Sequence, residues 1–518
     1  MSADPYLARA MQPATTDHDA ELVRHVAPPD WANPTPQERY HLVVIGAGTA
    51  GLVTASIAAT LGARVALVER HRMGGDCLNY GCVPSKALLR AARAHAEARH
   101  AAARFGGPAV SGPGDFGRVM ERMRRLRASI APHDGAARFR DLGVDVFLGS
   151  ARFAGRDAIA VGDRVLRFRR AVVATGARAF VPPIPGLEDV DPLTNETIFS
   201  LDELPARLAV VGAGPIGMEM AQAFARFGSR VTVVDRAEQV LPREDADAAA
   251  IVRAALERDG VSFLLGAAVV RAERRGAAKV LHVEAAGRRE ELAADAVLVA
   301  VGRAPNVDGL GLDDAGIAFD RGGIEVDRRM RTTNRRVFAI GDVASRFKFT
   351  HAADAQARLV AANALFGARA RADRLVMPWS TYTSPELAHT GLSARDAAAR
   401  GIAMDTITVP LAENDRAVLD GESEGFVRIH LAQGRDRILG ATIVAEHAGE
   451  MISELTTAIV NRIGLLALGR AIRPYPTVSE AIRRAADQHR RGALTPTRRR
   501  LLGWYFRLVS RSSARTRP

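Results

Sequence analysis

The sequence predicts an α/β protein in which two related units, each with a parallel sheet, precede a separate α+β domain. An apolar strand, a glycine-rich turn and a helical segment follow one another near His41 and again near Leu208. The two copies are about 165 residues apart, which indicates an internal duplication. From about Met377, alternating strand-like stretches and long helices replace this pattern, as expected of a different kind of domain.

Length and charge limit the function classes. With 518 residues, the chain has room for roughly three to four domains. Its net charge of +13 depends on the residues from Arg490 onward, which include nine arginines and no acidic residue. The rest of the chain carries +4 (13 minus 9), an ordinary globular balance. The charge therefore argues against nucleic acid as a partner of the whole protein.

The first 40 residues are polar and rich in proline, which predicts a loosely ordered arm. They lack the basic flank and apolar stretch of a signal peptide. No apolar run approaches the ~20 residues of a membrane span. Two cysteines in a long chain without an export signal suit the reducing cytoplasm. In that compartment a cysteine pair is more often catalytic or metal-binding than structural.

The first unit opens with an apolar run from His41 that predicts a buried strand. Gly46, Gly48 and Gly51 follow as G-x-G-x-x-G, before an alanine-rich helix. In this motif the glycines permit a tight turn, backbone approach to a pyrophosphate and close packing of helix on strand. The next strand ends at Glu69, where a carboxylate would accept hydrogen bonds from a ribose. The alternative is a glycine-rich turn without a ligand.

The second unit repeats the motif with Gly212, Gly214 and Gly217. Its next strand ends at Asp235, which favours a free ribose 2′-hydroxyl and therefore NADH. The neighbouring Arg236 would instead accommodate the 2′-phosphate of NADPH, or is a solvated surface charge.

Each unit has a further apolar run that we expect to form a strand, at residues 170–175 and 296–301. These runs occupy the same place in their units. We assign the residues at their ends to the cofactor sites: Ala174, Thr175 and Gly176 in the first unit, and Gly302 in the second.

Cys77 and Cys82 are the only cysteines and lie within residues 74–86, shortly after the first glycine motif. Such economy predicts a redox dithiol beside a bound nucleotide cofactor. A structural disulfide or a chance pair is the alternative. We expect no metal site, because no second Cys or His pair has the spacing of zinc ligands.

The order of these motifs resembles the pyridine nucleotide–disulfide oxidoreductases, the family of lipoamide dehydrogenase, glutathione reductase and mercuric reductase. The resemblance covers residues 41 to about 487. The segments that carry it are 46–51, 77–86, 174–176, 212–219 and 339–342. It implies one Rossmann-like domain for FAD, another for NADH or NADPH, and a C-terminal α+β dimerisation domain that forms a homodimer.

The resemblance and the composition together divide the chain into six segments. They are a polar N-terminal arm (1–40), the first part of the FAD-binding domain (41–186), the NAD(P)-binding domain (187–302), the second, central part of the FAD-binding domain (303–371), the interface domain (372–489) and a basic aromatic tail (490–518).

By the resemblance, Cys82 lies against the flavin and carries the thiolate, while Cys77 meets the substrate. A lowered thiol pKa is expected for this work. Lys86, one helical turn after Cys82, lies near the flavin and pairs with Glu219. The residues alone also allow a surface lysine and a carboxylate at the start of a helix.

Gly341 and Asp342 close the FAD site by the same resemblance, with the aspartate on the ribityl chain of the flavin. From the residues alone, Asp342 would be a helix N-cap, which is compatible with that role.

The C-terminal part departs from the disulfide reductases of this family, which have a His-Pro-Thr-x-x-Glu pattern. Their histidine comes from the partner subunit and acts as acid and base. Here Tyr475 replaces it, while Glu480 is kept. A phenol with an ordinary pKa near ~10 is a poorer base at pH 7 than an imidazole near ~6.5. Mercuric reductases also have tyrosine here, but this chain lacks their additional C-terminal cysteine pair. The alternative is that Tyr475 is only an aromatic side chain packed at the subunit interface.

We therefore expect an FAD-dependent enzyme that passes electrons from NAD(P)H through FAD to the Cys77–Cys82 disulfide and on to a metal ion or small electrophile. Dihydrolipoamide dehydrogenase is one alternative. Another, from a different class, is a membrane-attached flavin redox sensor that does not turn over.

The tail combines three arginines, residues 498–500, with the aromatic and aliphatic stretch 501–509. This pattern suits an interfacial helix on anionic lipid at the inner face of the membrane. A disordered basic end or a helix packed on the body is the alternative.

Overall fold

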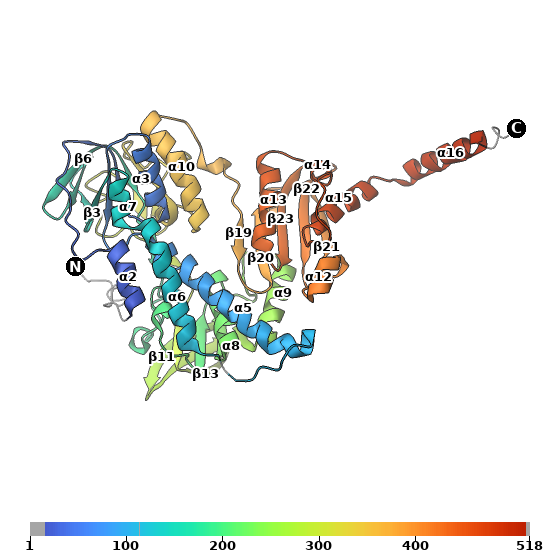
Figure 1. The fold of residues 1–518 in the computed structure, drawn as a ribbon, viewed down its shortest axis with the longest axis horizontal. Coiled ribbons are helices and arrows are strands. Elements are labelled where there is room, and N and C mark those ends of the chain that lie inside the picture. Colours follow the sequence, from blue (N-terminus) through green and yellow to red (C-terminus); the bar gives the residue numbers. More distant parts are fainter. Residues whose placement is uncertain (1–15, 113, 514–518) are drawn as a thin grey trace. The chain divides into compact units, whose positions relative to one another are not determined.

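The computed structural model describes residues 16–112 and 114–513, which form two compact units (Figure 1). The first unit contains the chain up to Pro242 together with Leu256–Leu375. The second contains Arg243–Ala255 and the chain from Val376 onward. Helix α9 (Ala246–Arg258) includes the point where the chain passes between them.

The first unit is built on a seven-stranded sheet with the order β3-β2-β1-β6-β5-β4, in which β18 also pairs with β6. Its parallel strands are β1 (Tyr40–Ile45), β2 (Val65–Glu69), β3 (Val144–Leu148), β6 (Arg164–Val173) and β18 (Val337–Ala339). The antiparallel strands are β4 (Ala151–Phe153) and β5 (Ala158–Val161). Every residue of β2 is buried, as expected of a parallel strand covered on both faces.

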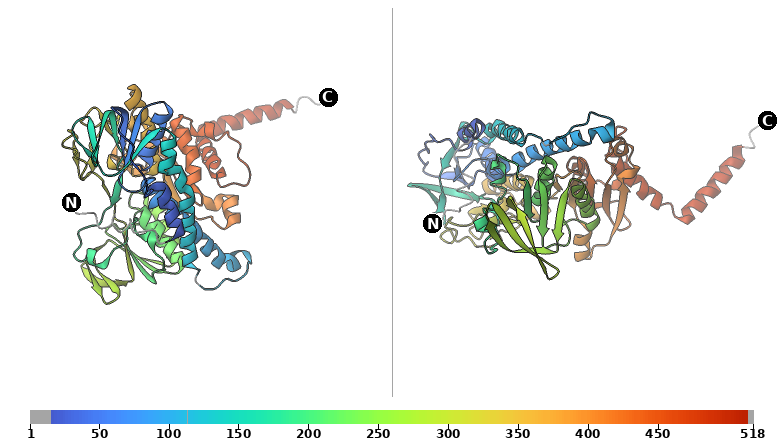
Figure 2. Two further views of the ribbon diagram at one scale, coloured as in Figure 1. Left: turned by 60° about the vertical axis from the view of Figure 1, so that its left-hand side comes forward. Right: turned by 90° about the horizontal axis from the view of Figure 1, so that it is seen from below.

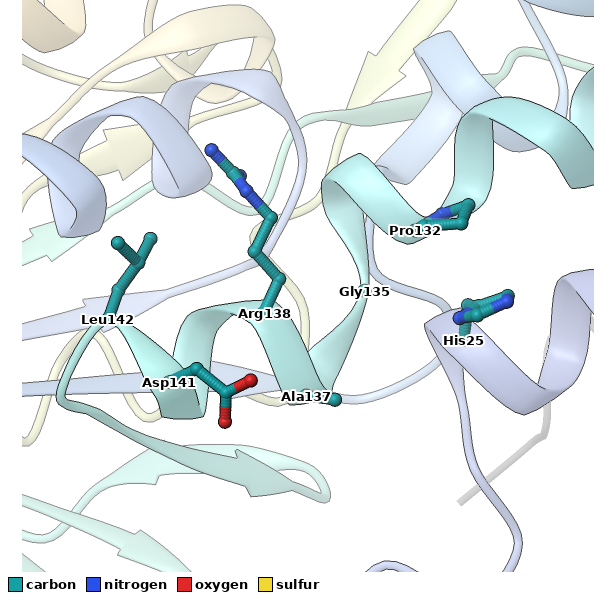
Figure 3. Close-up of a pocket in the computed structure, with 7 residues that line it drawn as sticks. All are labelled: His25, Pro132, Gly135, Ala137, Arg138, Asp141 and Leu142. Carbon is teal, nitrogen blue, oxygen red and sulfur yellow. The ribbon is translucent and has the colours of Figure 1, made fainter.

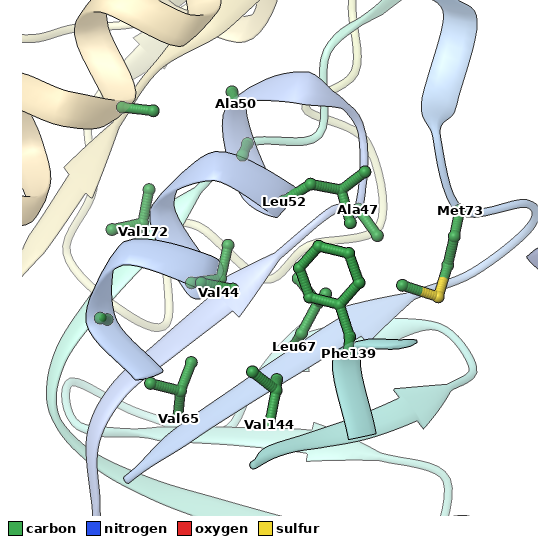
Figure 4. Packing of buried hydrophobic residues seen from close by; sticks show 14 of the residues in the cluster. Val44, Ala47, Ala50, Leu52, Val65, Leu67, Met73, Phe139, Val144 and Val172 are labelled. Carbon is green, nitrogen blue, oxygen red and sulfur yellow. The ribbon is translucent and has the colours of Figure 1, made fainter. Parts of the chain in front are cut away.

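Helices cover this sheet and enclose its core. Helix α3 (Thr49–Thr60) packs against α10 (Thr350–Phe366). Figure 4 shows the ring of Phe139 among Val44, Leu67 and Met73 in this apolar cluster. The other helices of this part are α2 (Asp17–Val26), α4 (Gly75–Asn79), α5 (Cys82–Phe105), α6 (Phe116–Ile130) and α7 (Ala136–Asp141).

A second parallel sheet of the first unit has the order β10-β9-β8-β14, and α8 (Pro215–Phe227) follows β8. Its strands are β8 (Arg207–Val211), β9 (Arg230–Asp235), β10 (Val261–Leu265) and β14 (Ala296–Val299). The remaining strands of the unit are antiparallel and comprise β11 (Ala267–Arg275), β12 (Ala278–Ala285) and β13 (Arg288–Ala294), the pair β7 (Ala177–Ala179) and β15 (Arg303–Pro305), and the pair β16 (Phe319–Asp320) and β17 (Gly323–Ile324).

The second unit has an antiparallel five-stranded sheet with the order β19-β20-β23-β22-β21, seen with its helices from two further directions in Figure 2. The strands are β19 (Trp379–Thr381), β20 (Glu386–Gly391), β21 (Met404–Pro410), β22 (Phe426–Ala432) and β23 (Ile438–Ala445). The helices are α11 (Ala394–Ala399), α12 (Asp415–Asp420), α13 (Ala448–Val460), α14 (Leu465–Leu468), α15 (Glu480–Gly492) and α16 (Pro496–Ser513).

Short 3-10 turns join several elements. They are η1 (Ala131–Asp134), η2 (Glu188–Val190), η3 (Ile198–Ser200), η4 (Gly341–Val343), η5 (Ala372–Arg374) and η6 (Leu411–Glu413). Across the residues that the structure describes, no helix is both long and apolar enough to cross a membrane.

The α/β class predicted from the sequence is confirmed, with differences in detail. The strand expected at 170–175 is the end of a longer strand, β6, and stops at Val173; the strand expected at 296–301 stops at Val299. Alternating exposed and buried residues in the first half of β6 hide it from a search for apolar runs.

The N-terminal arm also differs from its prediction, because helix α2 lies within it; residues 1–15 are outside the described range. Thr16 caps α2 by accepting a hydrogen bond from the Asp19 amide at 3.2 Å. The Asp19 carboxylate then pairs with Arg127 at 2.7 Å, and Leu22 is fully buried. Tertiary contacts therefore order a segment whose composition predicts a loose arm.

Phe139 provides a test of the first core, because its side chain is 1% exposed. We expect Phe139→Ala to lower the free energy of unfolding by about 3–5 kcal/mol, through lost burial and the cavity left behind. Urea unfolding followed by circular dichroism measures this. The matched control is Phe105→Ala, whose side chain is 67% exposed and should cost little. Equal losses for the two variants would contradict the packing described here.

Candidate active site

The first glycine turn joins β1 to α3 and is shaped by close backbone contacts. Gly46 has a φ of +99°, and a Cβ there would lie 2.4 Å from the carbonyl oxygen of Ala174. A Cβ on Gly51 would lie 1.8 Å from the carbonyl oxygen of Gly46. Among the described residues, a Cβ on Gly48, the N-cap of α3, would meet only the Cα of Gly75, at 3.7 Å. The turn therefore leaves an open backbone face at a helix N-terminus, which suits a pyrophosphate.

Glu69, at the end of β2, is held against this turn. Its carboxylate accepts hydrogen bonds from the amides of Ala47 at 2.7 Å and His71 at 2.8 Å. Burial raises the pKa of Glu69, and the two amide hydrogen bonds oppose that rise. Its position beside the glycine turn fits a ribose at the same end of the sheet.

The second glycine turn repeats this arrangement between β8 and α8. Asp235 accepts hydrogen bonds from the amides of Ala213 at 2.5 Å and Ala237 at 2.7 Å. Gly214 is the N-cap of α8, and a Cβ there would meet no atom of the described residues within 4 Å. Arg236, the residue after Asp235, is exposed.

The two cysteines lie on consecutive helices, Cys77 within α4 and Cys82 at the first residue of α5. Both are free thiols, and a hydrogen bond joins them. The Cys82 Sγ lies 3.3 Å from the hydroxyl of Thr350, the first residue of α10. The N-terminus of the long helix α5 adds a favourable dipole at Cys82.

These contacts make the two thiols unequal. The hydrogen bond from Cys77, then that from Thr350 and the charge of Lys86, lower the pKa of Cys82 to about 6, against the effect of burial. The same thiol pair and burial raise the pKa of Cys77. The proton therefore stays on Cys77, and Cys82 carries the thiolate at neutral pH.

Lys86 and Glu219 are brought together from separate helices. The Lys86 Nζ lies 2.7 Å from the Glu219 Oε2, and the Glu219 side chain is only 7% exposed. Lys86 is one turn after Cys82 on α5, and Glu219 follows the second glycine motif on α8. This ion pair links the dithiol helix to the second glycine-turn helix.

Asp342 lies inside the turn η4 rather than at its N-cap, which is Ile340. Burial raises the pKa of Asp342, while nearby Arg303 opposes that rise. The Arg303 Nε lies 3.3 Å from the Asp342 Oδ2, and its guanidinium also pairs with Asp76 beside Cys77. The amide of Gly341 donates to Gln356 Oε1 at 2.8 Å.

The other residues assigned to the cofactor sites lie at strand ends in the first unit. Ala174 follows β6 and supplies the carbonyl that faces Gly46. The Thr175 hydroxyl donates to the carbonyl of Asn306 at 2.8 Å. Gly176 precedes β7 and Gly302 precedes its partner strand β15. Ala174 and Thr175 thus lie against the first glycine turn, as expected of the carboxyl end of a parallel strand.

Within the second unit, the hydroxyl of Tyr475 donates a hydrogen bond to Asp415 Oδ2 at 2.9 Å, and the side chain is 70% exposed. This contact raises the pKa of Tyr475. Glu480 is the first residue of α15, is buried and pairs with Arg483. Tyr475 is thus exposed rather than packed in its own chain, and even less of it is ionised to the basic phenolate at neutral pH than of an ordinary phenol.

Sequence reasoning missed three residues around the dithiol, Asp76, Arg303 and Thr350, and, within the second unit, Asp415 as the partner of Tyr475. Asp76 lies beside Cys77 in the dithiol segment, so its position was a usable signal. Thr350 and Arg303 are 268 and 227 residues from the groups they contact, and no local pattern indicates such pairs.

A pocket of about 400 Å³ lies elsewhere in the first unit and is shown in Figure 3. Its lining consists of His25, Pro132, Gly135, Ala137, Arg138, Asp141 and Leu142. It includes none of the predicted site residues. Within residues 16–112 and 114–513, no group of three or more His, Cys, Asp or Glu side chains could hold a metal ion.

The sequence and the fold are both similar to those of known proteins of one family. Residues 40–357 match the model of the pyridine nucleotide-disulphide oxidoreductases, and residues 377–486 match the dimerisation domain of the same proteins. A mercuric reductase of Bacillus cereus is 33% identical over 448 residues, covering 86% of this chain and 71% of that protein. Dihydrolipoyl dehydrogenase 3 of Haloarcula marismortui is 36% identical over 468 residues, covering 88% and 97%.

Among solved structures, the Cu(II) complex of the HOCl-induced flavoprotein disulfide reductase RclA from Escherichia coli is similar. It has a TM-score of 0.78 and 30% identity, and the match covers 87% of this chain and 100% of RclA.

The pKa of Cys82 can be titrated directly. Since its pKa is lowered to about 6, alkylation of Cys82 by iodoacetamide should rise through pH 6 and level off above it. Thr350→Ala removes a hydrogen bond to the thiolate and should move the midpoint up by about one pKa unit. Thr350→Ser keeps the hydroxyl and is the control. A midpoint that does not move in Thr350→Ala would exclude the hydroxyl as a determinant.

The Lys86–Glu219 pair can be tested by stability. Lys86→Met leaves the buried Glu219 carboxylate without its cation, so we expect a loss of about 1–3 kcal/mol. Thermal unfolding of the two single variants and of Lys86→Met with Glu219→Gln gives the coupling energy. The exposed pair Arg358–Asp354 is the control, and Arg358→Met should cost about 0.5 kcal/mol or less. Additive effects of the two substitutions would contradict a direct interaction.

Proposed function

Because the chain belongs to the pyridine nucleotide-disulphide oxidoreductase family, a family of flavoprotein enzymes that use FAD and NAD(P)H, we propose that it reduces a metal ion or another small electrophile. Electrons come from NADH or NADPH and leave through the Cys77–Cys82 pair. The observation that carries the proposal is the polarised dithiol, in which the pKa of Cys82 is lowered to about 6 while that of Cys77 is raised.

The described residues fit FAD at the first glycine turn and a nicotinamide dinucleotide at the second. The open face at Gly48 would take the FAD pyrophosphate, Glu69 its ribose and Asp342 its ribityl chain, with Lys86 near the flavin ring. The residues for NAD(P)H are Gly212, Gly214, Gly217, Asp235 and Gly302. When bound, FAD supplies the chemistry that couples two-electron hydride transfer to thiol chemistry.

Electrons and protons balance when the dithiol forms and is oxidised again. Reduction of the Cys77–Cys82 disulfide takes up two electrons and one proton; the proton goes to Cys77, and Cys82 remains a thiolate. Lys86 stabilises that thiolate by its charge. Return to the disulfide releases two electrons and the proton. With a metal ion as acceptor, one NAD(P)H therefore reduces one Hg(II) to Hg(0) or two Cu(II) ions to Cu(I), with NAD(P)⁺ and one proton as the other products.

The state of Tyr475 supports an acceptor that needs no strong base. Its pKa is raised by Asp415, so it abstracts protons poorly at neutral pH. A metal ion binds thiolate sulfur without such help. Mercuric reductases among the relatives and the Cu(II) complex of RclA agree with this acceptor class. Dihydrolipoamide dehydrogenase is the second candidate, supported by relatives of that name at 35–36% identity.

The dimerisation domain at residues 377–486 supports a homodimer. In such a dimer, Tyr475 and Glu480 of one subunit would complete the site of the other.

The presence of only two cysteines in the sequence suits the cytoplasm, where reducing conditions protect the dithiol from nonspecific oxidation.

The acceptor is tested by steady-state oxidation of NADH and of NADPH with Hg(II), Cu(II), a quinone, lipoamide and glutathione disulfide. We expect repeated turnover with a metal ion, and loss of it in Cys77→Ala. Tyr475→Phe should retain metal reduction. Tyr475→His should raise dihydrolipoamide oxidation at least about tenfold, because imidazole restores a general base.

Fast dihydrolipoamide oxidation by the unaltered enzyme would favour the second candidate. Reduction by NAD(P)H without turnover on any acceptor would favour a redox sensor and exclude the proposed catalysis.

A further inference from the structure

Helix α16 carries bulky apolar side chains that are largely exposed. Leu501 is 61% exposed, Trp504 60% and Phe506 61%. The helix extends away from the sheet of its own unit (Figures 1 and 2). An exposed apolar face of this size on a helix marks an interaction surface. We propose that α16 lies in the headgroup region of an anionic membrane and attaches the enzyme to it.

The residues of α16 divide into two faces at the helical period of 100° per residue. The apolar face takes more than half of the circumference and consists of Leu501, Leu502, Trp504, Tyr505, Phe506, Leu508 and Val509. The opposite face carries Arg499, Arg500 and Arg507, with Gly503 between them. Arg498, in the first turn, donates to the carbonyl of Ala493 before the helix, so it is held back from the apolar face.

This division fits a helix that lies in the membrane plane rather than one that spans it. Four arginines fall between residues 498 and 507, and no described helix meets the requirements of a membrane span. Trp504 and Tyr505 have amphipathic rings, which prefer the interface between headgroups and acyl chains. An arginine face above an aromatic and aliphatic face is the pattern of an interfacial anchor.

Charge identifies the lipid as anionic. No acidic residue follows Asp487 in the sequence, so the arginines of α16 have no carboxylate nearby along the chain. Each arginine near an anionic surface raises binding by about fivefold at moderate salt. A nucleic acid would engage only the arginine face, and a second copy of α16 only the apolar face. A layer of anionic headgroups over acyl chains engages both faces at once.

The test measures binding of the full-length holoenzyme to vesicles of phosphatidylcholine with about one-third phosphatidylglycerol. We expect co-sedimentation that weakens at high salt and falls at least about tenfold with phosphatidylcholine alone. A chain that ends at Ala493 should lose binding while its thermal unfolding is unchanged. Equal binding by the shortened chain overturns the proposal.

Two variants that add the same charge separate the faces. Tyr505→Glu places a carboxylate in the middle of the apolar face and should weaken binding more than tenfold. Gly503→Glu places it among the arginines and should weaken binding only about fivefold or less. Equal effects of the two variants would mean that only net charge matters and would overturn the interfacial placement.

Trp504 provides the spectroscopic readout. Its fluorescence should shift to the blue on vesicles and be quenched by brominated lipid, and Trp504→Phe should abolish the signal but keep binding. Two further outcomes would contradict the proposal. One is duplex DNA binding by the full chain that is tighter than vesicle binding and lost with the shortened chain. The other is a change of oligomeric mass in the shortened chain with vesicle binding retained.

Discussion

The geometry around the dithiol depends on one largely buried guanidinium. Arg303 is 15% exposed and pairs with Asp76 beside Cys77, lies 3.3 Å from Asp342 in η4, and donates to the carbonyl of Ala177 at 2.6 Å. Three segments far apart in the chain are thereby tied together. Removing one partner of such a buried charge cluster typically costs about 3–5 kcal/mol, because the remaining charges stay buried without compensation. The same cluster joins the helix that carries Cys77 to the turn that we assign to FAD.

The polarity of the dithiol arises first from the hydrogen bond between its two thiols, which lowers the pKa of Cys82 and raises that of Cys77. The hydroxyl of Thr350 and the charge of Lys86 lower the pKa of Cys82 further. In the second unit, the hydrogen bond to Asp415 raises the pKa of Tyr475, so little basic phenolate is present at neutral pH. Both effects support the proposal of an electron acceptor that binds sulfur directly.

Much of the fold was predictable because its signals are local. The two glycine turns follow apolar strands, and the backbone contacts at Gly46 and Gly51 leave no room for a side chain. The helix α2 and the first half of β6 were not predictable in this way. Both have polar or alternating sequences whose order comes from partners elsewhere in the chain, such as Arg127 for α2.

The sequence by itself determined the turns, the two acidic strand ends and the dithiol, because turn chemistry and residue spacing act over a few positions. It also placed Lys86 one helical turn from Cys82. The resemblance had already assigned the thiolate to Cys82, but only the tertiary structure shows which groups from distant segments lower its pKa and what holds Tyr475. Those outcomes depend on Thr350 and Asp415, which lie 268 and 60 residues from their partners. Hydrogen bonds and charges act through space, so the folded chain sets them and local patterns do not reveal them.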